Sequence, residues 1–179
     1  PHGNGTHTEC VGHISKENYS LNDYLKTFFF LAEVVTVQPE KQQDDFIISI
    51  HQLQKTCRHS AAEALIIRTL PNKVEKLTHH YSNTNPPYLH HEAAEWMVQR
   101  GIKHLLLDLP SVDREKDDGK LLAHHAFWQY PQNTRLDCTI TELIFVPDHI
   151  PDGLYLLNIQ ITSLENDASP SKPVLYKLE

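Results

Sequence analysis

One helix-to-strand passage near the middle of the chain restricts the fold most. Apolar residues recur there at the spacing of one helix face: Leu89, Ala93, Ala94, Met97 and Val98. Gly101 follows where a C-terminal cap belongs, and residues 102–107 then carry apolar side chains on both faces. Such a run is typical of a strand in a sheet that is covered on both sides. A helix leading directly into it predicts a parallel crossover, and therefore an α/β fold in which helices flank a mixed sheet.

Other apolar and β-branched runs are expected to complete the sheet. We predict strands at residues 28–37, 46–50, 64–69, 138–145, 154–162 and 174–178. Short helices are predicted near residues 20–25, 53–57 and 120–128, with polar loops at 40–45 and 165–173 and a hairpin-type connection at 147–153. Residues 73–87 lack periodicity, so they are expected to form a long surface loop, either a lid over a site or a solvated excursion.

Length and charge limit the architecture and the partners. With 179 residues, of which 40% are hydrophobic, the chain can bury one core but is short for two, so a single domain over residues 1–179 is expected. No apolar run approaches the ~20 residues of a membrane span. The formal net charge is −7 and Lys and Arg do not cluster, so neither a membrane nor a nucleic acid is expected as a partner.

The cysteines and the first residue bear on location. Cys10, Cys57 and Cys138 are odd in number and lack CxxC spacing, which favours a reducing, cytoplasmic compartment over a disulfide framework. The chain opens at Pro1, without a methionine, directly on its most chemical segment. A functional segment at a raw terminus would fray, so we expect a leading segment to be missing. A removed signal peptide is one cause, which leaves a processed N-terminus open.

The first thirteen residues concentrate candidate metal ligands. His7 and Glu9 are two positions apart, so in an extended segment their side chains leave the same face. His13 returns near that face, directly or across a turn at Gly12. An imidazole and a carboxylate with a third imidazole close by suit zinc or manganese. The competing interpretation is a glycine- and histidine-rich surface loop.

A metal ion needs three or more protein ligands, and His124 and Glu142 are the best downstream supply. Glu142 lies in an otherwise apolar strand, where a lone carboxylate is costly to bury unless it is paired or bound to a cation. The alternative is an outward position on an edge strand. His124 and His125 are adjacent on a predicted helix, so they cannot face the same way. Either one of them binds, or neither does.

Three further residues follow a predicted strand end, where sites in mixed α/β sheets often lie: Asp108, Ser111 and Asp113. They are candidates for supporting the ligands, but the same pattern also caps and reverses a chain. Cys10 lies among the histidines, which makes a thiol nucleophile or a soft ligand a further candidate. The sequence contains no phosphate-binding loop, dinucleotide fingerprint or Gly-x-Ser-x-Gly elbow.

The segment Asn4-Gly5-Thr6-His7-Thr8-Glu9, with His13, resembles the His-x-Gly-Thr-His-x-Asp-x-x-x-His signature of the metal-dependent cyclase family. That family includes bacterial kynurenine formamidases and isatin hydrolases. Further segments along nearly the whole chain look like parts of the family: Ala64 to Thr69, Pro87 to Leu89 with the following helix, Asp108 to Asp113, and Pro151 to Leu175. His124 and Glu142 fall where the family has its downstream ligands.

The resemblance implies a swivelling β/β/α domain and the hydrolysis of an amide or lactam at one or two zinc or manganese ions. It implies that His7 is a ligand of the first metal and His124 of the second. Glu9 and Glu142 would bridge or share both, and His13 would be the general acid/base. Members usually form dimers or higher oligomers, so a homodimer or homotetramer is expected.

This sequence departs from the family pattern in several places. The first histidine of the signature falls on Gly3, and His2 is one residue away. A shift by one residue in an extended segment reverses the side chain, so either a local bulge brings His2 to the metal or only one ion remains. The usual aspartate is Glu9, which is one methylene longer. A polar insertion before Glu142 also leaves His125 as a rival to His124.

The sequence therefore predicts a metal-dependent hydrolase of a small amide, lactam or ester. His13 would take a proton from the activated water and return it to the leaving group, and residues 73–87 would form a wall over the small-molecule substrate. The rival interpretation, which Gly3 and Glu9 favour, is a degenerate, non-catalytic member of the fold acting as a binding or assembly module. The identity of the substrate does not follow, because Trp96 and Trp128 fit a core equally well.

Overall fold

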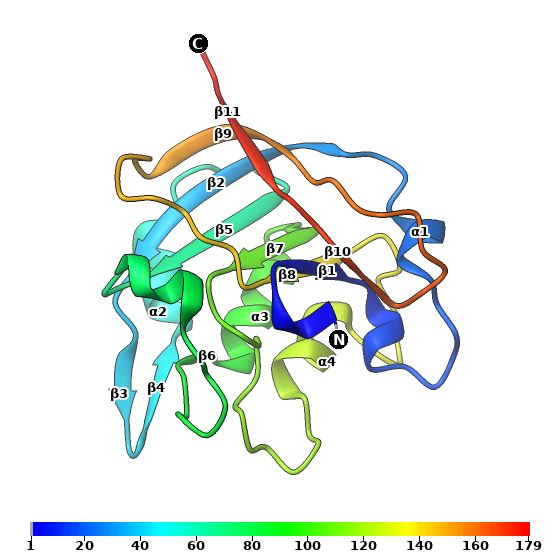
Figure 1. Cartoon of the computed structure of the whole chain (residues 1–179), viewed down its shortest axis with the longest axis horizontal. Coiled ribbons are helices and arrows are strands. Elements are labelled where there is room, and N and C mark those ends of the chain that lie inside the picture. The colour runs from blue at the N-terminus through cyan, green and yellow to red at the C-terminus, as the bar shows by residue number, and fades with distance from the viewer. Residues whose placement is uncertain (1) are drawn as a thin grey trace.

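The computed structural model describes residues 2–179, with side chains from residue 3 onward, and within this range the main element is an eight-stranded mixed sheet (Figure 1). The strand order is β10-β1-β8-β7-β5-β2-β9-β11. A smaller sheet of β3, β4 and β6 lies beside it. The fold is thus the expected α/β arrangement of a mixed sheet with flanking helices.

Four neighbouring strands in the middle of the large sheet run parallel: β2 (Phe29–Val37), β5 (Ala64–Thr69), β7 (His104–Leu107) and β8 (Thr139–Glu142). Helix α3 (His91–Gln99) precedes β7 and α4 (Leu122–Trp128) precedes β8. The helix-to-strand passage in the sequence is therefore a parallel crossover, as predicted.

Antiparallel strands from the two ends of the chain complete the sheet. Strand β1 (His7–Glu9) lies between β8 and β10 (Ala168–Pro170). Strand β9 (Gly153–Asn158) lies between β2 and β11 (Val174–Lys177). Figure 1 shows the blue N-terminal strand beside the red C-terminal segment, so residues far apart in the sequence become neighbours here.

The predicted hairpin at residues 147–153 is wrong, because β8 and β9 lie at separate places in the sheet. Arg68 of β5 explains the path of this connection. Its Nη1 donates to the carbonyls of Pro147 and Ile150, and its Nη2 donates to Asp152. The buried guanidinium thus holds the segment against the ends of the parallel strands.

The polar linker predicted at residues 40–45 is in fact a hairpin of β3 (Glu40–Gln42) and β4 (Asp45–Ile48). Gln43 has a φ of 56° in its tight turn. Strand β4 also pairs with β6 (Tyr88–Leu89), and the expected loop between β5 and β6 contains the 3₁₀ helix η3 (Val74–Thr78). The short helices α1 (Leu21–Tyr24) and α2 (Ile50–Thr56) lie near the predicted positions.

The two faces of the sheet have separate apolar cores. Leu65, Ile67, Leu105 and Leu107 pack with α3 and α4 on one face. The alternate strand residues pack on the other face with residues of α1 and β9, which is why the strands are apolar on both sides. Trp128 is fully buried in the first core, which makes it a packing residue. Within residues 2–179, no helix is long and apolar enough to span a membrane.

Candidate metal centre

Strand β1 is only three residues long, but its register places two candidate ligands beside a third. His7 lies directly opposite Glu142 of β8, and Glu9 lies opposite Ile140. Because alternate residues of a strand share a face, His7, Glu9 and Glu142 project to the same side of the sheet. The intervening Thr8 points to the other side. Since β8 lies between β1 and β7, Glu142 is not on an edge strand.

The four predicted ligand residues converge in a buried cluster. His7 Nε2 lies 3.5 Å from Glu142 Oε2 and 3.8 Å from Glu9 Oε2. His124 Nε2, from α4, lies 3.1 Å from Glu9 Oε1 and 3.9 Å from Glu142 Oε1. Each of these four side chains is at most 6% exposed. Imidazole and carboxylate groups from both ends of the chain therefore face one small volume.

Hydrogen bonds on the outer side of the cluster orient both imidazoles. His7 Nδ1 donates to the carbonyl of Gly5 at 2.9 Å, and His124 Nδ1 donates to Asp113 Oδ2 at 2.5 Å. These bonds leave the Nε2 atoms facing the carboxylates. Asp113 also accepts the backbone N–H groups of Ala123 and His124, so the start of α4 and the imidazole share one anchor.

Ser111 and Asp108, the other two candidates in the Asp108–Asp113 turn, make structural hydrogen bonds. Ser111 Oγ accepts the N–H of Asp113 and so shapes the turn. Asp108 accepts bonds from the backbone and hydroxyl of Thr69 and from Lys76 Nζ at 2.7 Å. It therefore links η3 to the ends of β5 and β7.

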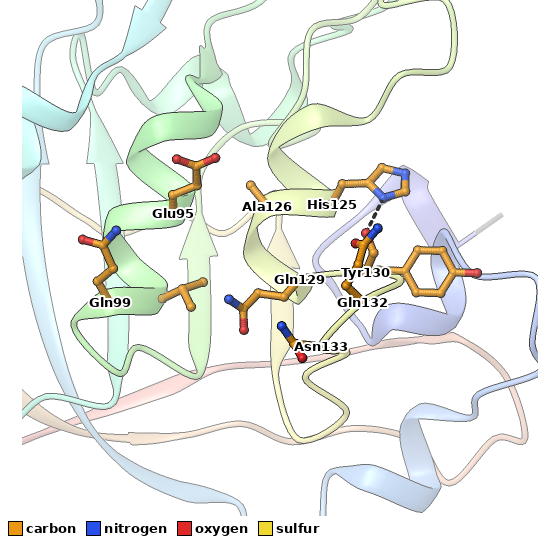
Figure 2. Close-up of a pocket in the computed structure, with 9 residues that line it drawn as sticks. Glu95, Gln99, His125, Ala126, Gln129, Tyr130, Gln132 and Asn133 are labelled. Carbon is orange, nitrogen blue, oxygen red and sulfur yellow. Dashed lines mark hydrogen bonds between the residues drawn. The ribbon is translucent and has the colours of Figure 1, made fainter.

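His13 and His125 lie at the border of the cluster and outside it, respectively. His13 ends the 3₁₀ helix η2 (Val11–His13), and its half-exposed side chain brings Nδ1 to 3.5 Å from Glu9 Oε2. His125 Nδ1 donates to the carbonyl of Tyr130 (Figure 2). His125 lines a polar cavity of about 370 Å³ between α3 and α4, so His124 is the member of the pair that reaches Glu9.

The structure adds one residue that sequence reasoning missed. Asp167, in the loop before β10, places Oδ2 at 3.2 Å from His13 Nδ1. The two residues are 154 positions apart, and Asp167 belongs to a polar loop without a motif. No local sequence signal could have found this contact.

The pKa values of three groups in the cluster, Glu9, His124 and Glu142, are shifted from their ordinary values. Burial favours a raised pKa for Glu9, but the hydrogen bond and charge of His124, together with His13 and His7, bring it below its ordinary value. Burial and the charge of Glu9 raise the pKa of Glu142 well above its ordinary value. Burial opposes protonation of His124, yet its bonds to Asp113 and Glu9 raise its pKa to about 10. Two buried carboxylates this close favour binding of positive charge.

The donor set fits a divalent cation. Glu9 Oε2 is buried and accepts no hydrogen bond within the described chain, which is costly unless a cation binds it. Ligand atoms of His7, Glu9 and Glu142 lie within 4.8 Å of one another, and so do those of Glu9, His13 and His124. Imidazole nitrogen and carboxylate oxygen are the ligands that zinc and manganese take. Glu9 belongs to both groups.

The structure bears on two alternatives raised by the sequence, His2 as a metal ligand and Cys10 as a nucleophile. Gly3 lies in the 3₁₀ helix η1 (His2–Asn4), so the argument that an extended segment turns His2 away does not apply. The side chain of His2 lies outside the described residues. Cys10 is fully buried, its Sγ donates to the carbonyl of Tyr19, and burial raises its pKa to about 11. A buried thiol with a raised pKa is a poor nucleophile.

Comparisons with known proteins show the family to which the chain is similar. The Cyclase family profile matches residues 1–114. A kynurenine formamidase from Bacillus cytotoxicus is 26% identical over 179 residues, covering 97% of this chain and 76% of that protein. One from Bacillus mycoides is 31% identical over 181 residues, covering 96% and 74%.

Solved structures share the fold at low sequence identity. One, described as a potential metal-dependent hydrolase with cyclase activity, has a TM-score of 0.75 at 15% identity and covers 100% of this chain and 81% of its own. An isatin hydrolase bound to the product analogue thioisatinate has a TM-score of 0.65 at 14% identity and covers 97% and 71%. With the profile matching more than half of the chain and relatives similar over nearly all of it, this protein belongs to the Cyclase family of hydrolases.

Proposed function

We propose that this protein is a metal-dependent hydrolase of a small amide, lactam or ester. The observation that carries the proposal is the convergence of His7, Glu9, His124 and Glu142 in one buried cluster. Within it, Glu9 Oε2 accepts no hydrogen bond from the described residues. The names of the relatives, kynurenine formamidase and isatin hydrolase, favour cleavage of a C–N bond in an amide or lactam.

His7, Glu9, Glu142 and His124 would hold one or two zinc or manganese ions, with Glu9 shared between the two groups of ligand atoms. A divalent ion in such a site supplies Lewis acidity, which polarises a carbonyl oxygen and makes a water molecule more acidic. Asp113 and the carbonyl of Gly5 keep the two imidazoles turned toward the carboxylates. The site is therefore preorganised by this chain's own hydrogen bonds.

His13 is proposed as the general acid/base. It combines contact with Glu9 with a side chain that is 36% exposed, whereas the four proposed ligands are buried. An imidazole at the border of the cluster can take a proton from water and return it to a leaving nitrogen or oxygen. Asp167 Oδ2 lies 3.2 Å from the same nitrogen, Nδ1, that approaches Glu9.

The non-reacting part of the substrate is proposed to lie in a cavity of about 550 Å³ next to β1. Residues 3–6, 76–82 and 143–145 contribute to its walls. An adjoining, more apolar cavity of about 480 Å³ shares Thr6, Leu77, Ile144 and Phe145 with it. This arrangement supports the prediction that the loop between β5 and β6 forms a wall over the substrate.

The test combines metal analysis with turnover on named probes. Protein purified without an affinity tag is loaded with zinc or manganese, dialysed and analysed for ions per chain. It is then assayed with N-formylkynurenine, isatin and a phenyl ester. We expect one or two ions per chain and hydrolysis of at least one probe. Glu9→Gln should lose both ions and turnover, while Glu165→Gln, which changes a carboxylate in an exposed loop, should keep both.

Two outcomes would contradict the proposal. A chain that binds no ion at the cluster has no centre for this chemistry. A fully loaded chain that cleaves no probe would favour the rival role of a non-catalytic binding or assembly module, consistent with Gly3 at the first signature position. Assembly into a homodimer or homotetramer stays a prediction, which light scattering would check.

A further inference from the structure

Asp167 and His13 form a contact between the two ends of the chain that the proposed ligands do not explain. Asp167 Oδ2 lies 3.2 Å from His13 Nδ1 within hydrogen-bonding geometry. Glu9 Oε2 lies farther from the same nitrogen, at 3.5 Å, and takes no hydrogen bond from it. The carboxylate of Asp167 is therefore the better placed acceptor for His13 Nδ1.

The backbone on both sides of this contact is fixed. The carbonyl of Asp167 accepts the N–H of Cys10 at 2.9 Å, and the next residue, Ala168, pairs with Glu9 in the sheet. Gly12 packs tightly in the same place: a Cβ there would lie 3.0 Å from Asp167 Cβ and 2.2 Å from the carbonyl oxygen of Tyr19. The turn that carries His13 and the loop that carries Asp167 are thus held together independently of the two side chains.

A neutral imidazole has one N–H donor and one acceptor nitrogen, whereas an ionised carboxylate only accepts. A hydrogen bond between His13 Nδ1 and Asp167 therefore requires the proton on Nδ1 and makes Nε2 the acceptor. His124 also directs Nδ1 at an aspartate nearby, Asp113 Oδ2 at 2.5 Å, while its Nε2 lies 3.1 Å from Glu9 Oε1. The two imidazole centroids are 5.7 Å apart. One His–Asp pair thus presents a proposed ligand, and the other presents a proposed base.

We propose that Asp167 is a positioning residue that sets the tautomer and orientation of His13. The proposal rests on the proposed function in one respect, namely that His13 is the general acid/base. In this role Asp167 acts through the imidazole of His13. With the proton held on Nδ1, Nε2 receives the proton of the attacking water, and the carboxylate stabilises the imidazolium until that proton passes to the leaving group.

The first test reads the tautomer directly. Protein labelled with ¹⁵N in histidine and loaded with zinc is examined by long-range ¹H–¹⁵N correlation, and the His13 signals are assigned by their loss in His13→Gln. We expect the Nδ1–H tautomer in the wild type and a mixture containing Nε2–H in Asp167→Ala. A wild-type Nε2–H tautomer, a zinc-bound Nδ1, or a tautomer unchanged in Asp167→Ala would overturn the proposal.

The second test separates positioning from folding and from metal binding. Asp167→Ala should lower kcat about 10–100-fold on whichever probe the wild type cleaves, with KM and ions per chain near wild type. Asp167→Asn keeps the size of the side chain and should lie in between, while Asp167→Glu should recover part of the loss. Glu165→Gln is the matched control from the same loop and should change neither kcat nor the tautomer. An unchanged kcat in Asp167→Ala would contradict the proposal.

The two proposals can fail separately. If the zinc-loaded wild type cleaves no probe, the proposed function fails, and the tautomer measurement still decides whether Asp167 orients His13. If the wild type is active and Asp167→Ala matches it in kcat and tautomer, the positioning role fails and the hydrolase stands. An equal loss of ions and turnover in Asp167→Ala would show a structural role in the metal centre instead.

Discussion

His13 and Glu9 are four positions apart, yet the structure surrounds them differently. Glu9 is 1% exposed and lies between two histidines, whereas the His13 side chain is 36% exposed and bonded to Asp167. This difference in burial separates a proposed ligand from a proposed base. It also makes their roles distinguishable by experiment.

We predict that His13→Ala keeps its metal but loses turnover. General acid/base catalysis contributes roughly 10²–10⁴-fold, so kcat should fall by at least about 100-fold. Elemental analysis after dialysis should give the same number of ions per chain as the wild type. A parallel loss of ions and activity would identify His13 as a ligand, and His125→Ala, on the other side of α4, is the control.

His104 should make the protein sensitive to acid. It is buried in β7 with its ring 3.8 Å from that of Phe30, and its Nδ1 lies 2.9 Å from Thr139 Oγ1. Burial lowers its pKa to about 4, whereas the unfolded chain has the ordinary value near 6.5. The folded state therefore binds fewer protons between these values, and stability is full above pH 6.5 and falls toward pH 4.

The size of this loss of stability follows from the shift in the pKa of His104. The wild type should lose about 3 kcal/mol of unfolding free energy between pH 6.5 and pH 4 relative to His104→Gln. Urea unfolding of metal-free protein at several pH values measures the difference. Parallel pH profiles for the two proteins would show that His104 is not the titrating group.

At the scale of elements, burial decided which parts could be predicted from the sequence. Strands β2, β5 and β7 are apolar on both faces, because each packs into two cores, and this signal is local. Strand β3 is exposed along its whole length, so its sequence reads as a linker. Strand β8 ends at Glu142 because Leu143 adopts a φ of 54°, which an apolar run does not reveal.

In the candidate site, too, some features follow from the local sequence and others depend on the tertiary structure. The spacing of His7 and Glu9 is a local property of a strand, so their shared face could be inferred. Which of His124 and His125 faces Glu9 depends on how Asp113 anchors the start of α4. The contact of Asp167 depends on the pairing of β1 with β10 and has no local signal.

Lys76 links the 3₁₀ helix η3 to the sheet. Lys76 Nζ donates to the carbonyl and hydroxyl of Thr69 and to Asp108, which is buried. Lys76→Met would leave that carboxylate without its cation, so we predict a loss of about 3 kcal/mol in stability. Because η3 lines the proposed substrate cavity, KM should rise while ions per chain stay constant.

Lys73→Met provides the matched control, since Lys73 is exposed at the start of the same loop. Urea unfolding, KM on an active probe and the rate of limited proteolysis within residues 73–87 measure the effect. An unchanged KM in Lys76→Met would show that η3 does not form the substrate wall.

At the scale of the whole molecule, ion binding and folding should be linked. Two close, buried carboxylates repel each other until a cation joins them, so the ion binds the folded chain in preference to the unfolded one. At an ion concentration about a hundredfold above Kd, the gain is about 2.7 kcal/mol. For a chain of this size the thermal midpoint should rise by roughly 5–10 °C.

Calorimetry with a chelator and then with zinc or manganese measures this rise. Glu9→Gln should show little or no increase, because it removes the carboxylate common to both groups of ligand atoms. An equal increase in wild type and Glu9→Gln would place the stabilising ion elsewhere on the protein.

The placement of β1 has a consequence for biosynthesis. Its residues are translated well before both of its pairing partners, β8 and β10. More than a hundred residues are translated between Glu9 and Glu142. If the proposed ion binds these residues, its complete set of ligands is available only after translation has passed β8.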